Sequence, residues 1–295
     1  MASQIKLEDC ETKYLKLSDG SRLCYAEYGD PDGAPVLVFH GNPGSRLGWG
    51  AMPGSPFLAG LRIIAPDRPG YGRTDFKRNA LTKWPADIVQ LLDYLEIKKV
   101  ILFAPSGGAP YALACAWKHP ERFSVIGLFG AVGPNHPDAV KGALRSLKLL
   151  WRIAGPLQLL IRLQMWILSL LAKRNPLKLA TALRNAELNE TDKQVFDEDD
   201  VKALFTRDFP EAYRQNGIGS ADDTRIPACW PIPLSDIKPK VIIWHAERDQ
   251  LVGQMPIYLH SQLPNSELIK IPNQGHLWVL KNIALMLSVL LKKGS

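Results

Sequence analysis

Cysteines are scarce in this chain, and their scarcity narrows the class of protein. The 295 residues include only four cysteines, which lie far apart and form no C-x-x-C pair. Four isolated thiols are too few for a disulfide-rich scaffold, so we expect a reducing compartment. The cysteines are Cys10, Cys24, Cys115 and Cys229.

Membrane-spanning and targeting segments are not evident either. In the most apolar helical stretch, the longest run without a charged residue covers residues 163–172, whereas a helix needs about 20 apolar residues to cross a bilayer. The first ten residues carry charges of both signs and lack the apolar core of a signal peptide. No spacing of His, Cys, Asp and Glu matches a zinc site. We therefore expect a cytoplasmic protein that needs no metal and no cofactor.

Acidic residues are missing from one stretch of the chain. The protein has 36 Lys and Arg against 29 Asp and Glu, a net charge of +7. Residues 139–178 hold eight of the basic residues and no acid, so the rest of the chain is close to neutral. Because the excess is local, we expect no nucleic-acid binding. The eight basic residues are Lys141, Arg145, Lys148, Arg152, Arg162, Lys173, Arg174 and Lys178.

What the chain does contain is a regular alternation of apolar runs and helix-length segments. A composition of 46% hydrophobic and 22% charged residues supports a substantial core. Residues 14–17 and 22–28 flank an Asp-Gly turn and predict an antiparallel hairpin. Continuous apolar runs then predict parallel strands covered on both faces, with helices between them and a helical insertion from about residue 133 to residue 234. The strands are expected at 36–39, 61–65, 100–103, 124–129, 241–244 and 268–271, and helices at 82–95 and 108–117.

Ser106 lies where a predicted strand turns sharply into a helix. The residues two before and two after it are Ala104 and Gly108, both small. A nucleophile elbow requires small residues at these positions, because the tight turn lifts the serine oxygen above the edge of the sheet. A Gly-rich turn that binds an anion at a helix N-terminus is the alternative.

A second loop favours the nucleophile elbow over the anion-binding turn as the interpretation of Ser106. Residues 36–39 lead into His40-Gly-Asn-Pro-Gly, a loop that in enzymes with such an elbow supplies half of an oxyanion hole. Two backbone N–H groups, of Asn42 and of Gly107, are the candidate donors for a developing oxyanion. A plain tight turn would also explain the composition of this loop.

With these motifs the sequence resembles the α/β-hydrolase superfamily, over about residues 14–281 apart from the insertion. The turn after residues 241–244 is similar to the family motif that carries the catalytic acid, with Ala246 in place of glycine, and it points to Asp249. The Gly-His pair after residues 268–271 resembles the loop of the catalytic histidine and points to His276. The order Ser106, Asp249, His276 is the chain order of this fold.

The resemblance implies an α/β fold: an eight-stranded, mostly parallel sheet with helices on both faces and an inserted all-helical cap. We expect the core in residues 1–133 and 235–295 and the cap in residues 134–234. Glu247 and Asp138 are the second-choice acids. His40 is expected to brace its loop, and Asp67 and Arg68 to make loop hydrogen bonds rather than to touch substrate.

The predicted cap has two halves of opposite charge. Residues 141–154 predict an amphipathic helix with a basic stripe, whereas residues 157–172 predict a helix with only a narrow polar stripe. The second helix needs cover from other cap helices, an apolar substrate, a dimer partner or lipid. Residues 187–223 hold 11 acids, so we expect the two halves to neutralise each other, in preference to peripheral membrane contact through the basic helices.

Three functions follow from this interpretation. The first is a serine hydrolase that cleaves a carboxylic ester, lactone or thioester of a small apolar molecule through an acyl-enzyme on Ser106. The second uses the same serine and histidine for C–C bond hydrolysis, a small-substrate peptidase reaction or a cyclase or lyase step. The third is a non-enzymatic ligand receptor. A serine nucleophile argues against epoxide hydrolases and haloalkane dehalogenases, which use Asp at that position. Either a monomer or a homodimer fits.

Overall fold

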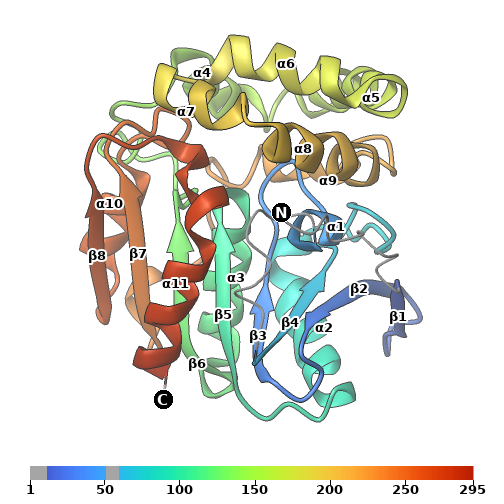
Figure 1. The fold of residues 1–295 in the computed structure, drawn as a ribbon, viewed down its shortest axis with the longest axis vertical. Helices are drawn as coiled ribbons and strands as arrows, with labels where there is room; N and C mark the ends of the chain where they lie inside the picture. Colours follow the sequence, from blue (N-terminus) through green and yellow to red (C-terminus); the bar gives the residue numbers. More distant parts are fainter. Residues whose placement is uncertain (1–11, 51–59, 295) are drawn as a thin grey trace, which may run out of the picture.

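The computed structural model describes residues 12–50 and 60–294, so Cys10 lies outside the described residues. Its centre is an eight-stranded sheet in the order β1-β2-β4-β3-β5-β6-β7-β8 (Figure 1). Cys24, Cys115 and Cys229 are unpaired. The strands are β1 (Lys13–Lys16), β2 (Arg22–Gly29), β3 (Ala34–Val38), β4 (Leu61–Pro66), β5 (Val100–Pro105), β6 (Phe123–Phe129), β7 (Lys240–Ala246) and β8 (Ser266–Ile271).

The predicted strand pairing is confirmed. β1 and β2 form the antiparallel hairpin, and β2 pairs antiparallel with β4. The remaining neighbours from β4 to β8 pair in parallel. Because parallel strands all end at the same edge of the sheet, the loops that follow β3, β5, β7 and β8 are brought together there.

Helices cover both faces of the sheet, as expected for buried parallel strands. Alternate residues of β3 divide between the two faces: Leu37 belongs to the core beneath α2 and α3, whereas Val36 and Val38 belong to the core beneath α11. This two-residue period follows from the pleat of a strand. The helices of the core are α1 (Arg46–Gly50), α2 (Ala80–Tyr94), α3 (Ala109–Lys118), α10 (Met255–Gln262) and α11 (Val279–Gly294).

The segment between β6 and β7 is helical where the sequence predicts a cap. We call residues 134–234 the helical insertion. Its helices form a layer across the carboxyl ends of the parallel strands (Figure 1). They are α4 (Arg145–Ile153), α5 (Gln158–Arg174), α6 (Pro176–Glu187), α7 (Glu190–Phe196), α8 (Asp199–Ala212) and α9 (Ile218–Asp223).

The first helix of the insertion is shorter than predicted. The basic stripe from Lys141 suggests a helix over residues 141–154, but α4 begins at Arg145. Gly142 has φ 77°, in the left-handed region, which a right-handed helix does not tolerate. Lys141 therefore lies in the preceding turn, where its ammonium group pairs with Asp138.

The expected neutralisation between the two halves of the insertion is wrong for most of the charges. Among the described residues, one ion pair joins the basic stretch to the acidic half, between Arg162 and Asp222 at 4.0 Å. The acids instead pair with cations elsewhere, because α7 and α8 pack on the core and beside α6, while α9 packs beside α5 and reaches the core through Asp223. These pairs are Lys281 with Glu198 and Asp200, Arg184 with Asp197, Arg46 with Glu211, and Arg68 with Asp223.

None of the helices in residues 12–50 and 60–294 is both long enough and apolar enough to cross a membrane.

Candidate functional site

Ser106 lies at a strained turn directly after β5. Its φ is 52°, a conformation that costs energy for any residue with a side chain and that is found at functional sites. Close packing explains the small neighbours: a Cβ atom at Gly108 would lie 2.9 Å from the His40 carbonyl oxygen. Across the turn, a Cβ atom at Gly41 would lie 3.4 Å from the Ser106 Cβ. The serine is therefore held where the loop after β3 meets the end of β5.

Asp249 and His276 form a buried hydrogen-bonded pair. Asp249 follows β7 and His276 follows β8, and the His276 Nδ1 lies 2.6 Å from the Asp249 Oδ2. The other carboxylate oxygen of Asp249 accepts from the backbone N–H groups of Leu251 and Val252. Burial opposes protonation of the imidazole, but the adjacent carboxylate outweighs it and raises the pKa of His276. The pair therefore fixes the imidazole with its Nδ1 toward the acid.

Gly130, which follows β6, makes room for this pair. A Cβ atom at this position would lie 2.8 Å from the His276 Cε1 and 2.9 Å from the Asp249 Oδ2. Its φ of 51° also favours glycine. Nothing in the local sequence marks Gly130, because the contact depends on loops more than 100 residues apart in the chain.

The backbone of Asn42 lies against the turn that carries Ser106. A Cβ atom at Gly107 would lie 3.2 Å from the Asn42 nitrogen. The N–H of Asn42 donates no hydrogen bond within the described parts of the chain, and the N–H of Gly107 is in the first turn of a helix, where no intrahelical acceptor exists. The Asn42 side chain accepts a hydrogen bond from Ser220 of the insertion.

His40 and Arg68 brace this loop, as the sequence suggests. The His40 Nε2 accepts from the Arg68 backbone N–H, so its Nδ1 carries the proton and donates to the Gly41 carbonyl oxygen. Burial, with the nearby Arg68 guanidinium, lowers the pKa of His40 well below its usual value. The buried Arg68 side chain donates to the His40 and Gly41 carbonyl oxygens and pairs with Asp223 of α9. His40 is therefore a neutral structural group.

Ser106 and His276 line one cavity of about 200 Å³ between the sheet edge and the helical insertion. Its walls are mostly apolar, and α6, α7 and α8 supply them together with α1 and the start of α11. The apolar lining residues include Trp49, Ala180, Leu183, Leu188, Phe196, Leu204, Phe205, Phe209, Leu277, Val279 and Leu280.

Asp208 of α8 is the most perturbed acid in the cavity lining. Its carboxylate accepts a hydrogen bond from the Ser45 hydroxyl. Burial raises the pKa of Asp208 to about 7, because this hydrogen bond only partly offsets the loss of water. The cavity wall therefore holds a carboxyl group that changes charge near neutral pH.

Asp192 of α7 connects the insertion to the loop of His276. One carboxylate oxygen accepts from the His276 backbone N–H at 2.9 Å and the other from the Leu277 N–H at 2.6 Å. Asn189 donates from one amide nitrogen to the Asp192 carboxylate and to the Arg248 carbonyl oxygen beside Asp249. Sequence reasoning missed this contact, because nothing local marks a helical aspartate that binds a distant loop.

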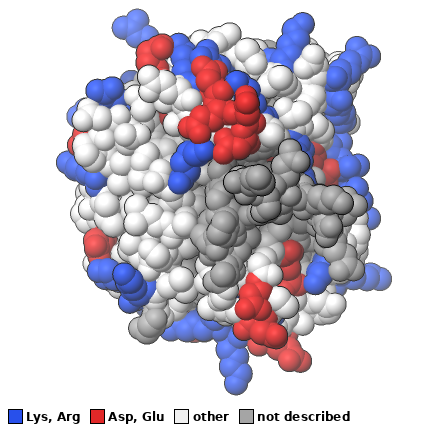
Figure 2. Space-filling view, in the orientation of Figure 1, with Lys and Arg blue, Asp and Glu red and all other residues white. Residues whose placement is uncertain are grey.

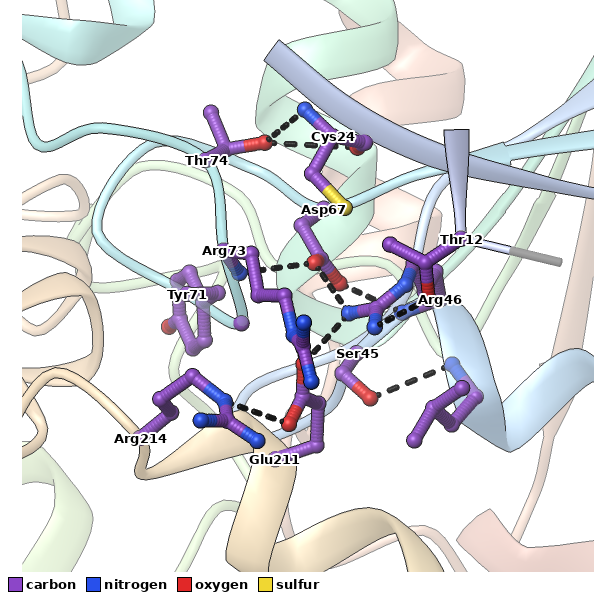
Figure 3. Close-up of polar contacts among 12 residues, drawn as sticks. Thr12, Cys24, Ser45, Arg46, Asp67, Tyr71, Arg73, Thr74, Glu211 and Arg214 are labelled. Carbon is purple, nitrogen blue, oxygen red and sulfur yellow. Dashed lines mark hydrogen bonds and ion pairs between the residues drawn. The ribbon is translucent and has the colours of Figure 1, made fainter. Parts of the chain in front are cut away.

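A buried ion cluster fastens α8 to the core near the cavity (Figure 3). The Arg46 guanidinium lies 2.6 Å from the Asp67 carboxylate and 2.6 Å from the Glu211 carboxylate. All three side chains are almost fully buried. Arg214 and Arg73 approach Glu211 from the exposed side. Asp67 therefore serves the scaffold, as expected from the sequence.

The remaining titratable candidates lie elsewhere. Asp138 is exposed and pairs with Lys141, and Glu247 is exposed. His136 stacks on Tyr258, and His260 hydrogen-bonds to Ser266. Within the described ranges, no cluster of His, Cys, Asp and Glu could hold a metal ion.

Comparison with known proteins identifies the family to which the chain is related. The family described as alpha/beta hydrolase fold matches residues 34–282. The 2-hydroxymuconate semialdehyde hydrolase of Pseudomonas putida is 27% identical over 270 residues, 88% of this chain and 86% of that protein. Proline iminopeptidase of Neisseria gonorrhoeae is 34% identical over 127 residues, 40% of this chain and 39% of that protein.

Similarity between this chain and solved structures shows a shared fold. A thermophilic esterase from Thermogutta terrifontis superposes with a TM-score of 0.66 at 18% identity, over 96% of this chain and 99% of that chain. The chain spans only about two fifths of the length of several curated relatives, the iminopeptidase among them. The family match, however, runs from β3 to the start of α11 and includes every loop at the cavity. The chain therefore belongs to the α/β hydrolase fold family.

Proposed function

We propose that the protein is a serine hydrolase that cleaves a carboxylic ester of a small apolar molecule. One observation carries the proposal. Ser106, in a strained turn, and His276 line the same apolar cavity, and the His276 Nδ1 is hydrogen-bonded to the buried Asp249 carboxylate. These residues fit the roles of nucleophile, base and orienting acid in acyl transfer.

In the proposed reaction, His276 accepts the Ser106 proton through its Nε2 while the serine oxygen attacks the ester carbonyl carbon. Asp249 holds the imidazole tautomer and stabilises the imidazolium. The N–H groups of Asn42 and Gly107 donate to the oxyanion of the tetrahedral intermediate. The imidazolium then protonates the leaving alkoxide, and an acyl-enzyme remains. Water, deprotonated by His276, attacks the acyl carbon and releases the acid and Ser106.

The cavity supports a short or medium apolar acyl group. Its volume of about 200 Å³ lies below the roughly 300–1,000 Å³ of drug-sized ligand pockets. Ala180 and Leu183 of α6 and Phe205 and Phe209 of α8 form apolar walls, which favour hydrocarbon over charged groups.

A fluorophosphonate probe and an ester series test the proposal. We expect the probe to label the protein, Ser106→Ala to abolish labelling, and the matched change Ser261→Ala, at an exposed serine of α10, to leave it intact. A p-nitrophenyl ester series should show turnover that Ser106→Ala lowers by several orders of magnitude. Unchanged turnover in Ser106→Ala would overturn the assignment, and a wild-type protein that is not labelled at all would favour a ligand receptor.

C–C bond hydrolysis is the second candidate. It is supported by the Pseudomonas putida 2-hydroxymuconate semialdehyde hydrolase, which aligns over 88% of this chain. In that case we expect fluorophosphonate labelling at Ser106 without turnover of any ester in the series. A peptidase, cyclase or lyase reaction would also give labelling without ester turnover. Assays with substrates of each of these reactions would distinguish them from C–C bond hydrolysis.

A further inference from the structure

The outward face of α5 is apolar. Most of the apolar side chains of this helix point to solvent, and Leu159, with 81% of its surface exposed, is the extreme case. The residues that α5 buries are Ile161, Met165, Ser169 and Ala172, on the opposite face. At 100° per residue the exposed side chains form one continuous face. Its members are Leu159, Leu160, Leu163, Trp166, Ile167 and Leu170.

Three polar side chains of α5 are used internally, whereas the exposed polar residues Gln164 and Arg174 lie at the border of this face and at its C-terminal end. Gln158 donates to the Ala221 carbonyl oxygen, and Arg162 approaches Asp222, both in α9. Lys173 donates to the Asn216 side chain. Helix α5 is therefore apolar on its outward face as well as on its buried face, whereas a surface helix usually turns polar residues outward.

The helices before and after α5 in the chain also expose apolar side chains. Leu149 of α4 is 57% exposed and Leu177 of α6 is 41% exposed. Of the twelve large hydrophobic side chains that are exposed in the described parts of the chain, nine lie between residues 149 and 177. Such a concentration marks a surface that contacts another apolar phase, because single exposed apolar residues are normally scattered. We call residues 149–177 the apolar patch.

Basic residues occur within the apolar patch and directly beside it along the chain. Arg145, Lys148 and Arg152 lie in α4, whereas Arg174 and Lys178 follow at the end of α5 and the start of α6. None of these five makes an ion pair within the described residues, so their charges are uncompensated. Figure 2 shows Lys and Arg along the upper right edge of the molecule, over the end of the insertion where Figure 1 places α5.

We propose that the apolar patch docks the protein onto the surface of an anionic phospholipid bilayer. Helices that lie in a membrane interface insert leucine, tryptophan and similar apolar side chains on one face, and nearby Lys and Arg strengthen their binding to anionic lipid. Unpaired basic residues near an anionic surface add an attraction that salt screens. The complementarity of charge thus favours a bilayer that carries negative headgroups.

A second copy of the chain fits this surface less well. A twofold dimer would place the patch against itself, so two surfaces with the same excess of unpaired cations would meet. Like charges at such a contact are unfavourable. An anionic bilayer removes this repulsion.

Docking would bring the cavity close to the bilayer. Helix α6 exposes Leu177, which belongs to the patch, and lines the cavity with Ala180 and Leu183. The same helix therefore contributes to the docking surface and to the cavity wall. The docking proposal itself does not depend on the proposed reaction, since it rests on the exposed face and its charges.

Vesicle flotation tests the docking. The protein carries Ser106→Ala so that no hydrolysis alters the lipids. It is mixed either with vesicles of phosphatidylcholine alone or with vesicles of phosphatidylcholine that contain about 30% phosphatidylserine. We expect flotation with the anionic vesicles, at least tenfold weaker partitioning to the neutral ones, and loss of binding as salt rises. The absence of binding to both vesicles would overturn the proposal.

Paired variants locate the binding surface. Leu160→Ser with Ile167→Ser should weaken partitioning at least tenfold, and Arg152→Glu with Arg174→Glu should do the same to anionic vesicles. The matched controls Tyr94→Ser with Leu285→Ser, and Lys98→Glu with Lys99→Glu, change exposed residues elsewhere and should bind as before. Unchanged binding by both patch variants would refute the assignment. If the apolar variant instead abolishes a dimer seen by analytical ultracentrifugation, without any vesicle binding, a second copy covers the patch.

Discussion

The carboxylate of Asp192 accepts hydrogen bonds from the backbone N–H groups of His276 and Leu277, although 84 residues separate Asp192 from His276. Asp192 belongs to α7 of the helical insertion, and His276 to the loop after β8. The position of the imidazole is thereby tied to the position of the insertion. We interpret Asp192 as a positioning residue for His276.

Replacing Asp192 by Asn should slow the reaction without weakening substrate binding. The amide keeps the shape of the carboxylate, but its NH2 group cannot accept a hydrogen bond, so one of the two N–H groups loses its partner. We expect kcat on an ester, and the rate of fluorophosphonate labelling, to fall roughly tenfold to a hundredfold, with KM little changed.

The matched control for this change is Glu190→Gln, at an exposed acid in the same helix that forms an ion pair with Lys193. It should keep wild-type rates. Both variants are compared below their Tm, so that unfolding does not contribute. A rate in Asp192→Asn equal to that of the control would mean that the contact is merely structural.

The pH dependence of activity should follow His276. Only the neutral imidazole can accept the Ser106 proton, so kcat/KM should rise with pH through a pKa above the usual value of 6.5, since Asp249 raises it. Asp249→Asn removes the carboxylate, and burial then lowers the pKa of His276. The rising limb should move to lower pH, while the rate falls by roughly 10³–10⁴. A limb that stays in place in Asp249→Asn would contradict the pairing.

The buried cluster around Arg46 should contribute strongly to stability. Arg46→Met leaves the Asp67 and Glu211 carboxylates buried without their cation, which costs about 3–5 kcal/mol in the free energy of unfolding. Arg214 binds the same Glu211, but its side chain is 48% exposed, so Arg214→Met should cost less than about 1 kcal/mol. Urea denaturation measures both. If both variants lower the free energy of unfolding by the same amount, the buried cluster does not stabilise the fold more than an exposed ion pair does.

Asp208 should make stability depend on pH. Its pKa is raised by burial from 3.8 to about 7 in the folded state, so the folded protein holds this proton more tightly than the unfolded chain. Its contribution to the free energy of unfolding is fully present below about pH 4 and is lost as the pH rises toward 7.

The variant Asp208→Asn has no ionisable group at this position, so its free energy of unfolding should not fall for this reason as the pH rises toward 7. Measured by urea denaturation, its stability relative to the wild type should be greater at pH 8 than at pH 5. Asp199→Asn, at a fully exposed acid of α8, serves as the control and should show no such change between the two pH values. A constant difference for Asp208→Asn would show that the carboxyl titrates normally.

Local pattern accounts for the parts of the site that the sequence predicts. Ser106 stands out because its small neighbours are required by the turn itself, and Asp249 and His276 because each directly follows a strand. Gly130 and Asp192 carry no comparable signal. Their roles arise from contacts between segments far apart in the chain, which hydrophobic periodicity and turn chemistry do not report.

The sequence by itself determined the alternation of strands and helices, the edge of the sheet at which the functional loops meet, and the nearly all-round apolar character of residues 157–172. Tertiary packing alone decided which side of α5 faces outward, because a helix apolar on most sides can bury any of them. It also decided the partners of the acids in the insertion. Once α7 and α8 pack on the core and beside α6, and α9 beside α5, their carboxylates lie beside cations such as Arg46, Arg68 and Lys281. Most of the basic residues in 139–178 then make no ion pair within the described residues.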